Sequence, residues 1–215
     1  MQTFTNKAGS VILDDLYQII HNNKQFLSDI DGLTGDGDHG INMNKGFTLC
    51  HEELIKNPGD LAHGLSVLSN ILMMKIGGSM GPLYGKFFKA MALSFKGKEE
   101  IGIVDFEESL NAAVAAIRSI SPAKTGDKTL MDTLLPAVES FKRAQVEGRS
   151  FSEALESLRE AAREGRDLTR DMVAKIGRAS RLGERSRGVM DAGAASCYLI
   201  LETFSDSIRK ILVET

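Results

Sequence analysis

The sequence predicts an all-α protein. Apolar residues recur every three or four positions in five windows, the spacing that places them on one face of an amphipathic helix. The windows run Ile12 to Ile30, Leu61 to Ile76, Phe106 to Ile117, Phe151 to Ala162 and Cys197 to Ile211. Alternating patterns typical of strands are absent, and the 21 glycines are concentrated between the helical windows. Because glycine is disfavoured in helix interiors, this distribution marks the connections of a helical bundle.

Capping patterns predict where several of these helices begin. Asp105 with Glu108, and Ser150 with Glu153, pair a capping side chain with a carboxylate three residues later. Such pairs satisfy backbone N–H groups that the first helical turn leaves free. Asp191 is predicted to cap the terminal helix in the same way.

Other local signals place connections and further helix starts. His39 to Asn42 is predicted to begin a helix, and residues 125–136 contain a turn and a helix start. The short β-like run Ile101 to Val104 is interrupted by Gly102, so we interpret it as a loop.

Composition predicts a cytoplasmic protein with one domain covering residues 1–215, with two compact units as the alternative that the length also allows. With 42% hydrophobic residues the chain can bury one sizeable core, and a net charge of −3 offers no broad field for nucleic acid or an anionic membrane. Cys50 and Cys197 lack the spacing of a disulfide framework or a zinc site, which favours a reducing compartment. No secretory signal pattern and no run of about 20 apolar residues is present, so no membrane span is predicted.

The first glycine-rich connection gathers three carboxylates. Asp31, Asp36 and Asp38 lie within eight residues, interleaved with glycines that let the backbone turn sharply. A hard cation such as Mg2+ would offset their repulsion, and it usually keeps positions open for phosphate oxygens. A solvated acidic turn is the simpler alternative. A calcium-binding EF-hand is excluded, because Phe47 stands where the twelfth position needs a bidentate Glu.

Other residues near this loop favour an anion. His39 and Asn42 stand at a helix start, where free N–H groups and the helix dipole attract negative charge, although His39 could equally be a surface or capping residue. Further along, IGGSMGPLYG could bring backbone close to a ligand or form only a tight connection. Neither GxxxxGK[ST] nor GxGxxG after a strand occurs, so any nucleotide would bind outside these fingerprints.

The last two glycine-rich connections are ambiguous by themselves. Leu130 and Met131 could pack against a base or against the core. The second connection gathers four arginines, whose planar donors suit phosphate but which could also form a solvated face. These are Arg178, Arg181, Arg185 and Arg187.

Four stretches of the sequence are each weak evidence for a family, but their combination in this order is specific. They are GDGDHGINMNKGF, GGSMGPLYGKFF, GDKTLMDTLLPAVES and GRASRLGERSRGVMDAGAAS. In order and spacing they resemble the ADP-binding L subunit of dihydroxyacetone kinases across nearly the whole chain. The resemblance implies an antiparallel barrel of about eight helices with the nucleotide site at one end.

The resemblance also implies roles for individual residues. Asp31, Asp36 and Asp38 would hold two Mg2+ ions that bridge the phosphates of ADP or ATP, and with Arg178 they would form the catalytic set. The implied nucleotide-binding residues are His39, Gly40, Ile41, Asn42, Ser79, Met80, Ser121, Leu130, Arg178, Asp191, Ala192 and Gly193. Two positions depart from the family pattern: its usual serine stands one position earlier here, as Ser79 before Met80, and Ala192 replaces a proline.

The implied activity is transfer of a phosphoryl group to dihydroxyacetone or a related small ketose. Family members work with a K subunit that holds the ketone on a histidine, so this chain is expected to be active only with such a partner. The donor is either ATP or a bound ADP rephosphorylated by a phosphohistidine protein of the sugar phosphotransferase system. The alternative is a non-catalytic nucleotide-binding regulator that engages a transcription factor. A related fatty-acid kinase domain matches the Asp/Gly loop less well.

Overall fold

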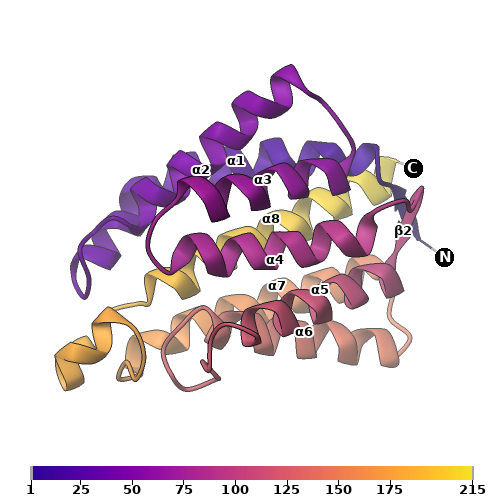
Figure 1. Ribbon diagram of the computed structural model, residues 1–215. Coiled ribbons are helices and arrows are strands. Elements are labelled where there is room, and N and C mark those ends of the chain that lie inside the picture. Colours follow the sequence, from indigo (N-terminus) through magenta and orange to yellow (C-terminus); the bar gives the residue numbers. More distant parts are fainter. Residues whose placement is uncertain (1, 215) are drawn as a thin grey trace.

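Helices account for most of the chain in the computed structural model, which describes residues 2–214 (Figure 1). The long helices are α1 (Val11–Gly32), α2 (His39–Lys56), α3 (Leu61–Lys75), α4 (Met80–Phe95), α5 (Ile103–Arg118), α6 (Met131–Val146), α7 (Phe151–Leu168) and α8 (Ala192–Glu214). The short elements are β1 (Thr3–Thr5), β2 (Glu100–Gly102) and the 3-10 helices η1 (Ala8–Ser10), η2 (Thr169–Asp171) and η3 (Arg178–Ser186).

The all-α prediction is confirmed, and each of the five apolar windows lies in a long helix. Each apolar stripe faces the core: Leu16, Leu65, Phe106, Leu155 and Phe204 are all fully buried. The helices pack against their neighbours in sequence, and α8 also contacts α1, α6 and α7. In Figure 1, α8 lies between the group α1 to α3 and the group α5 to α7. A closed barrel of these helices stays a prediction.

Helix α4 was not anticipated, because two glycines interrupt its apolar pattern. These glycines are required by close packing. A Cβ on Gly81 would lie 2.4 Å from the carbonyl oxygen of Ile76, and one on Gly85 would lie 2.2 Å from Cγ of Met73. Glycine therefore allows α3 and α4 to approach closely.

The interpretation of residues 101–104 as a loop is wrong. β2 pairs antiparallel with β1, with Phe4 opposite Ile101 and both side chains buried, and Ile103 begins α5. A strand of three residues is too short to show a pattern of its own. Its partner lies about a hundred positions away, so no local signal reveals the pairing.

One of the two predicted capping pairs is confirmed. Ser150 Oγ accepts from the backbone N–H of Glu153, and the Glu153 carboxylate accepts from the backbone N–H of Ser150. The assignment of Asp105 as the cap of α5 is wrong. Gly102 precedes the helix, and Asp105 is its third residue, with a carboxylate that accepts from the Gly102 N–H at 2.8 Å. Asp105 therefore supplies only the carboxylate that returns to the N-cap backbone, because Gly102 has no side chain to complete a capping box.

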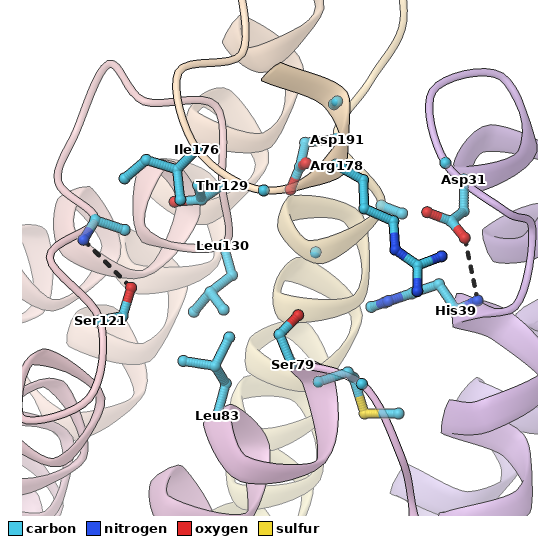
Figure 2. A pocket seen from close by; sticks show the side chains of 18 of the residues that line it. Asp31, His39, Ser79, Leu83, Ser121, Thr129, Leu130, Ile176, Arg178 and Asp191 are labelled. Carbon is cyan, nitrogen blue, oxygen red and sulfur yellow. Dashed lines mark hydrogen bonds between the residues drawn. The ribbon is translucent and has the colours of Figure 1, made fainter. Parts of the chain in front are cut away.

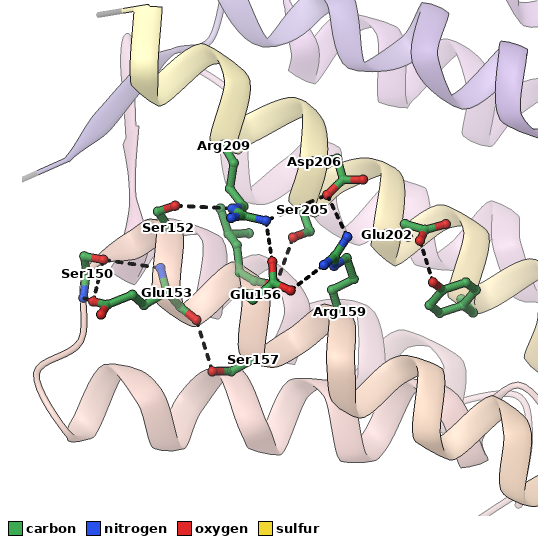
Figure 3. Close-up of polar contacts among 12 residues, drawn as sticks. Ser150, Ser152, Glu153, Glu156, Ser157, Arg159, Glu202, Ser205, Asp206 and Arg209 are labelled. Carbon is green, nitrogen blue, oxygen red and sulfur yellow. Dashed lines mark hydrogen bonds and ion pairs between the residues drawn. The ribbon is translucent and has the colours of Figure 1, made fainter.

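Polar contacts join α7 to α8 (Figure 3). Arg209 of α8 pairs with Glu156 of α7, and Arg159 of α7 lies 3.6 Å from Asp206 of α8. Ser205 donates a buried hydrogen bond of 2.9 Å to a backbone carbonyl of α7. Because solvent screens the partly exposed ion pairs, the buried bond and the apolar packing fix this seam more than the charges do.

Four connections lie at one end of the bundle, on the left of Figure 1. They join α1 to α2, α3 to α4, α5 to α6 and α7 to α8. The β1–β2 pair and the C-terminal end of α8 lie at the opposite end. Between residues 2 and 214, no helix combines the length and apolar character needed to cross a membrane.

Gly165→Ala tests the close contact between α7 and α6. A Cβ at this position would lie 2.2 Å from the carbonyl oxygen of Asp132, a backbone atom that cannot rotate away. We expect the free energy of unfolding to fall by about 1–3 kcal/mol, although alanine is the better helix former. Urea denaturation followed by circular dichroism measures the change. Gly32→Ala is the control, because its Cβ would meet only Cα of Gly37 at 3.8 Å. Equal stability of the two variants would contradict the contact.

Candidate functional site

The four connections at the left end of the bundle enclose a cavity of about 540 Å³. This volume is within the range of sites for small molecules and cofactors. One end of the cavity is formed by the carboxylate loop and the start of α2, and the other by apolar side chains of α4, α5 and the connections beside α6 and η3. The cavity is therefore charged at one end and apolar at the other.

Three carboxylates meet at the charged end. One oxygen from each of Asp31, Asp36 and Asp38 lies within 4.8 Å of the others. Asp31 is in the last turn of α1, and its backbone carbonyl accepts from the N–H groups of Thr34 and Gly35, which turns the chain back toward α2. Its carboxylate also accepts from the backbone N–H of His39 at 3.3 Å. Clustered carboxylate oxygens suit a hard divalent cation.

Arg178 reaches the same cluster from the opposite wall. It is the first residue of η3, follows Gly177 with a φ of 76°, and forms an ion pair with Asp36. Figure 2 shows its side chain extending across the cavity toward Asp31 and His39. Both partners of the ion pair are about half exposed, so the pair is weak and an incoming anion can displace it.

His39 is held from behind by a chain of polar groups. Its Nε2 lies 2.9 Å from Ser196 Oγ, which lies 2.7 Å from the hydroxyl of Tyr84, and that hydroxyl donates to the carbonyl oxygen of Gly193. Burial lowers the pKa of His39 to about 4, against the opposing charge of Asp31. The imidazole is therefore neutral at pH 7 and is neither a free surface group nor a side-chain cap.

The apolar end presents flat aliphatic surfaces. Leu83, Leu130 and Ile176 face one another across it in Figure 2, with Ile120 also in the lining. Met131 is 1% exposed and packs mainly in the core, whereas Leu130 faces the cavity. Of the two alternatives for these residues, packing in the core therefore applies to Met131, and Leu130 is the one positioned to contact a ligand.

Asp191 caps α8 as predicted and lies against the cavity. Its carboxylate accepts from the backbone N–H of Ala194 at 2.8 Å. Burial raises the pKa of Asp191 to about 7, the charges of Asp132 and Asp31 add to this, and the Ala194 N–H and Lys128 oppose it. At neutral pH a substantial fraction of this carboxyl group is protonated.

The structure brings most of the predicted site residues into one cavity. The lining includes Asp31, Asp36, Asp38, His39, Asn42, Ser79, Met80, Ser121, Leu130, Arg178, Asp191, Ala192 and Gly193. Two predicted residues do not line it. Gly40 is buried against α1, where a Cβ would lie 1.9 Å from the carbonyl oxygen of Lys24, and Ile41 is 64% exposed. The hydroxyl of Ser121 accepts from the backbone N–H of Ala123 at 3.3 Å.

Several lining residues were not anticipated from the sequence. Leu83 lies in the first turn of α4, Ile120 follows the end of α5, and Ile176 lies between η2 and η3. A single apolar residue at such positions carries no local pattern that marks a ligand site. Lys128 stands inside a quoted stretch, and nothing in the letters marks it as buried. Of the four clustered arginines, Arg178 alone belongs to the lining.

The fold and the cavity agree with comparisons to known proteins. The DAK2 domain family matches residues 33–206, so the chain belongs to this family. Within it, the chain is similar to the ADP-binding subunits of dihydroxyacetone kinase. It is 33% identical over 202 residues to the ADP-binding subunit DhaL of PEP-dependent dihydroxyacetone kinase 2 of Listeria innocua, covering 93% of both chains. It is 32% identical to the ADP-binding subunit DhaL of the PEP-dependent dihydroxyacetone kinase of Escherichia coli, covering 86% of this chain and 88% of that one.

A solved structure shows the same fold. The dihydroxyacetone kinase of C. freundii, in complex with AMP-PNP and Mg2+, superposes with a TM-score of 0.69 at 23% sequence identity. The superposition covers 93% of this chain and 33% of that one, so this chain spans about a third of its length.

Asp38→Asn tests whether the carboxylate cluster binds a divalent cation. Millimolar Mg2+ should raise the melting temperature of the wild type, because binding to the folded state alone stabilises it. The variant should lose most of this rise. In EDTA the variant should be equally stable, or more stable by about 0.5 kcal/mol, because one repelling charge is gone. Differential scanning calorimetry with and without Mg2+ measures both effects. A full Mg2+-dependent rise in the variant would contradict the site.

Asp191→Asn tests the raised pKa of the α8 cap. The folded state keeps a proton on Asp191 that the unfolded state releases near its ordinary pKa of about 4, so stability from this group is lost as pH rises from about 4 to 7. Asparagine cannot ionise but can still accept from the Ala194 N–H. The variant should therefore gain stability relative to the wild type from about pH 5 to pH 7, by about 1 kcal/mol per pH unit at most. Urea unfolding in EDTA at several pH values measures this, and parallel pH profiles would contradict it.

Proposed function

We propose that this chain is the nucleotide-carrying subunit of a kinase for dihydroxyacetone or a related small ketose. It would transfer a phosphoryl group from a Mg2+-bound nucleotide to a ketone held by a separate K subunit, with residues 1–215 acting as one domain. The observation that carries the proposal is the cavity: three carboxylates and Arg178 at one end, and an aliphatic slot at the other. Such a cavity matches the polarity of a nucleotide, whose phosphates are charged and whose base is flat and largely apolar.

The charged end would hold the metal and the phosphates. Asp31, Asp36 and Asp38 would bind Mg2+, two ions by the family resemblance, which would offset negative charge on the phosphates. Arg178 would leave Asp36 for a phosphate oxygen, to which its planar guanidinium can donate in pairs. His39, being neutral, would orient a phosphate by hydrogen bonding without adding charge.

The remaining lining would position the nucleoside and the phosphate chain. Leu130, with Leu83 and Ile176, would pack against the base. The start of α8, from Asp191 through Ala192 to Gly193, would approach the sugar. Residues around the start of α2 and the start of α4 supply backbone N–H groups at positive helix ends. Those in the lining are His39 and Asn42 for α2 and Ser79 and Met80 for α4, with Ser121 beside the base. Gly40 and Ile41, which lie outside the lining, would contribute through the backbone of the same first turn of α2.

This chain would supply positioning and electrostatic stabilisation, and it would not activate the acceptor. Phosphoryl transfer depends mainly on alignment and on charge neutralisation at the transferring group. The ketone hydroxyl would be presented by the K subunit. The donor would be a phosphohistidine protein acting on bound ADP, which the PEP-dependent names of the two relatives favour, or exchangeable ATP. A cytoplasmic location is part of the same proposal, supported by the free thiols of Cys50 and Cys197.

A second candidate is a non-catalytic nucleotide-binding regulator, which could engage a transcriptional regulator. Met80 favours it: this buried thioether occupies the position where the family pattern has a hydroxyl, and the hydroxyl of the exposed Ser79 enters the cavity lining one position earlier. The two candidates differ in turnover, not in nucleotide binding. Phosphorylation of dihydroxyacetone in the presence of a K subunit would separate them.

The proposed function predicts a bound nucleotide. The chain is purified without added nucleotide and denatured, and released nucleotide and magnesium are measured by chromatography and elemental analysis. We expect about one nucleotide per chain together with Mg2+, and loss of both in Asp36→Ala/Asp38→Ala. Asp29→Ala is the matched control, an exposed acidic residue of α1 outside the cavity. A wild-type chain that is free of nucleotide and fails to bind added Mg-ADP or Mg-ATP would refute the proposal. Ketose-dependent turnover by the single chain would refute the need for a K subunit.

A further inference from the structure

Lys128 is buried although it carries an ammonium group. The residue is 2% exposed, stands just before α6, and adopts a positive φ of 62°, a conformation that non-glycine residues rarely take. Burial lowers the pKa of this amine, and the negative charge of Asp191 opposes that effect. A buried charge is costly unless it is fully hydrogen-bonded, so its partners show what it does.

The ammonium group of Lys128 donates all its hydrogen bonds to backbone carbonyl oxygens. Nζ donates to the carbonyl oxygens of Met172 at 3.1 Å and Val189 at 2.7 Å, and also to that of Ser186. Lysine has three N–H donors, so these contacts use all of them. Although Lys128 borders the cavity, it therefore has no donor left for a phosphate, unlike the exposed Arg178.

The three carbonyls belong to the two ends of one segment. We define residues 172–189 as the arginine segment, because η3 and Arg178 lie within it. Met172 begins this segment, and Ser186 and Val189 close it, so one ammonium group ties both ends to the start of α6. Two further hydrogen bonds support this junction between the arginine segment and the residues before α6. The backbone N–H of Lys175 donates to the carbonyl oxygen of Asp127, and the backbone N–H of Ala174 donates to Ser186 Oγ.

Between its tied ends the arginine segment has few other constraints. Gly177 and Gly183 both have positive φ, at 76° and 55°, and no heavy atom lies within 4 Å of where their Cβ atoms would be. Most residues from 175 to 185 are exposed or half-buried. Arg178 directly follows the first of these glycines, so its reach to Asp36 depends on where the tied ends are held.

We infer that Lys128 is a positioning residue that fixes the arginine segment so that Arg178 reaches the carboxylate cluster and the phosphates bound there. This inference rests on the proposed function, because the benefit of a fixed Arg178 is nucleotide binding. Lys128 touches neither the metal nor the nucleotide and acts through Arg178. Charge-assisted bonds to three carbonyls hold the segment more firmly than neutral bonds would.

A double-mutant cycle tests the inference. Binding of Mg-ADP to nucleotide-stripped protein is measured by calorimetry for wild type, Lys128→Met, Arg178→Ala and the double variant. Methionine keeps the length of the side chain but cannot donate. We expect Lys128→Met alone to weaken binding about 10- to 100-fold, as losing a residue that orients a ligand commonly does. In the Arg178→Ala background the same change should weaken binding less than about 3-fold, because the residue it positions is gone.

Two further measurements separate positioning from general stability. Lys175→Met is the control: its side chain is 62% exposed, and its amine lies 3.9 Å from the Asp127 carboxylate. This change should alter binding less than about 2-fold. Hydrogen exchange of the amides in residues 173–185 should accelerate in Lys128→Met and stay unchanged in Lys175→Met. If Lys128→Met does not fold, Ser186→Ala takes its place in the cycle, because Ser186 Oγ joins Ala174 to Gly183 within the same segment.

The outcomes are distinct. Absence of Mg-ADP binding by the wild type would refute the proposed function and the inference with it. Binding by the wild type with equal affinity in Lys128→Met would refute the inference alone. Equal losses from Lys128→Met with and without Arg178 would also overturn it, since that pattern indicates a structural role independent of the arginine.

Discussion

Repulsion among Asp31, Asp36 and Asp38 is the constraint around which this end of the molecule is organised. Three like charges whose oxygen atoms lie within 4.8 Å of one another repel, and this repulsion destabilises the folded state. Few positive groups of the protein offset it. Arg178 pairs with one carboxylate, and a single backbone N–H reaches another. The cluster is thus left with more negative charge than these two contacts neutralise, which favours binding of a divalent cation.

The packing of the helices makes this clustering of carboxylates possible, because at glycine positions the backbones of neighbouring helices approach very closely. Gly40 packs against the carbonyl oxygen of Lys24, so α1 and α2 approach closely on either side of the carboxylate loop. Gly165 does the same for α7 and the start of α6, beside the junction that Lys128 occupies. Rigid contacts between helices therefore place the flexible connections, and the connections supply the chemistry.

Local patterns in the sequence reveal the parts of this structure that depend on nearby residues. Helix windows such as Leu61 to Ile76 follow from the spacing of apolar side chains, and the carboxylate loop follows from the spacing of Asp and Gly. Helix α4 could not be predicted in this way, because its glycines are required by packing against a neighbouring helix. The β1–β2 pair could not be predicted either, because its two strands are distant in sequence. The burial of Lys128 could not be predicted for a related reason: its three hydrogen-bond partners lie 44 to 61 residues away, and no local signal separates a buried lysine from an exposed one.

The β1–β2 pair and the C-terminal end of α8 lie at the end of the bundle opposite the cavity (Figure 1). A fluorophore, an affinity handle or a surface linker attached at β1 or in the last turn of α8 is therefore separated from the cavity by the length of the helices. At about 1.5 Å per residue, the 23 residues of α8 span about 35 Å. The molecule can be immobilised through this end of the bundle with the mouth of its cavity facing solution, an orientation suited to surface-based measurement of ligands and docking proteins.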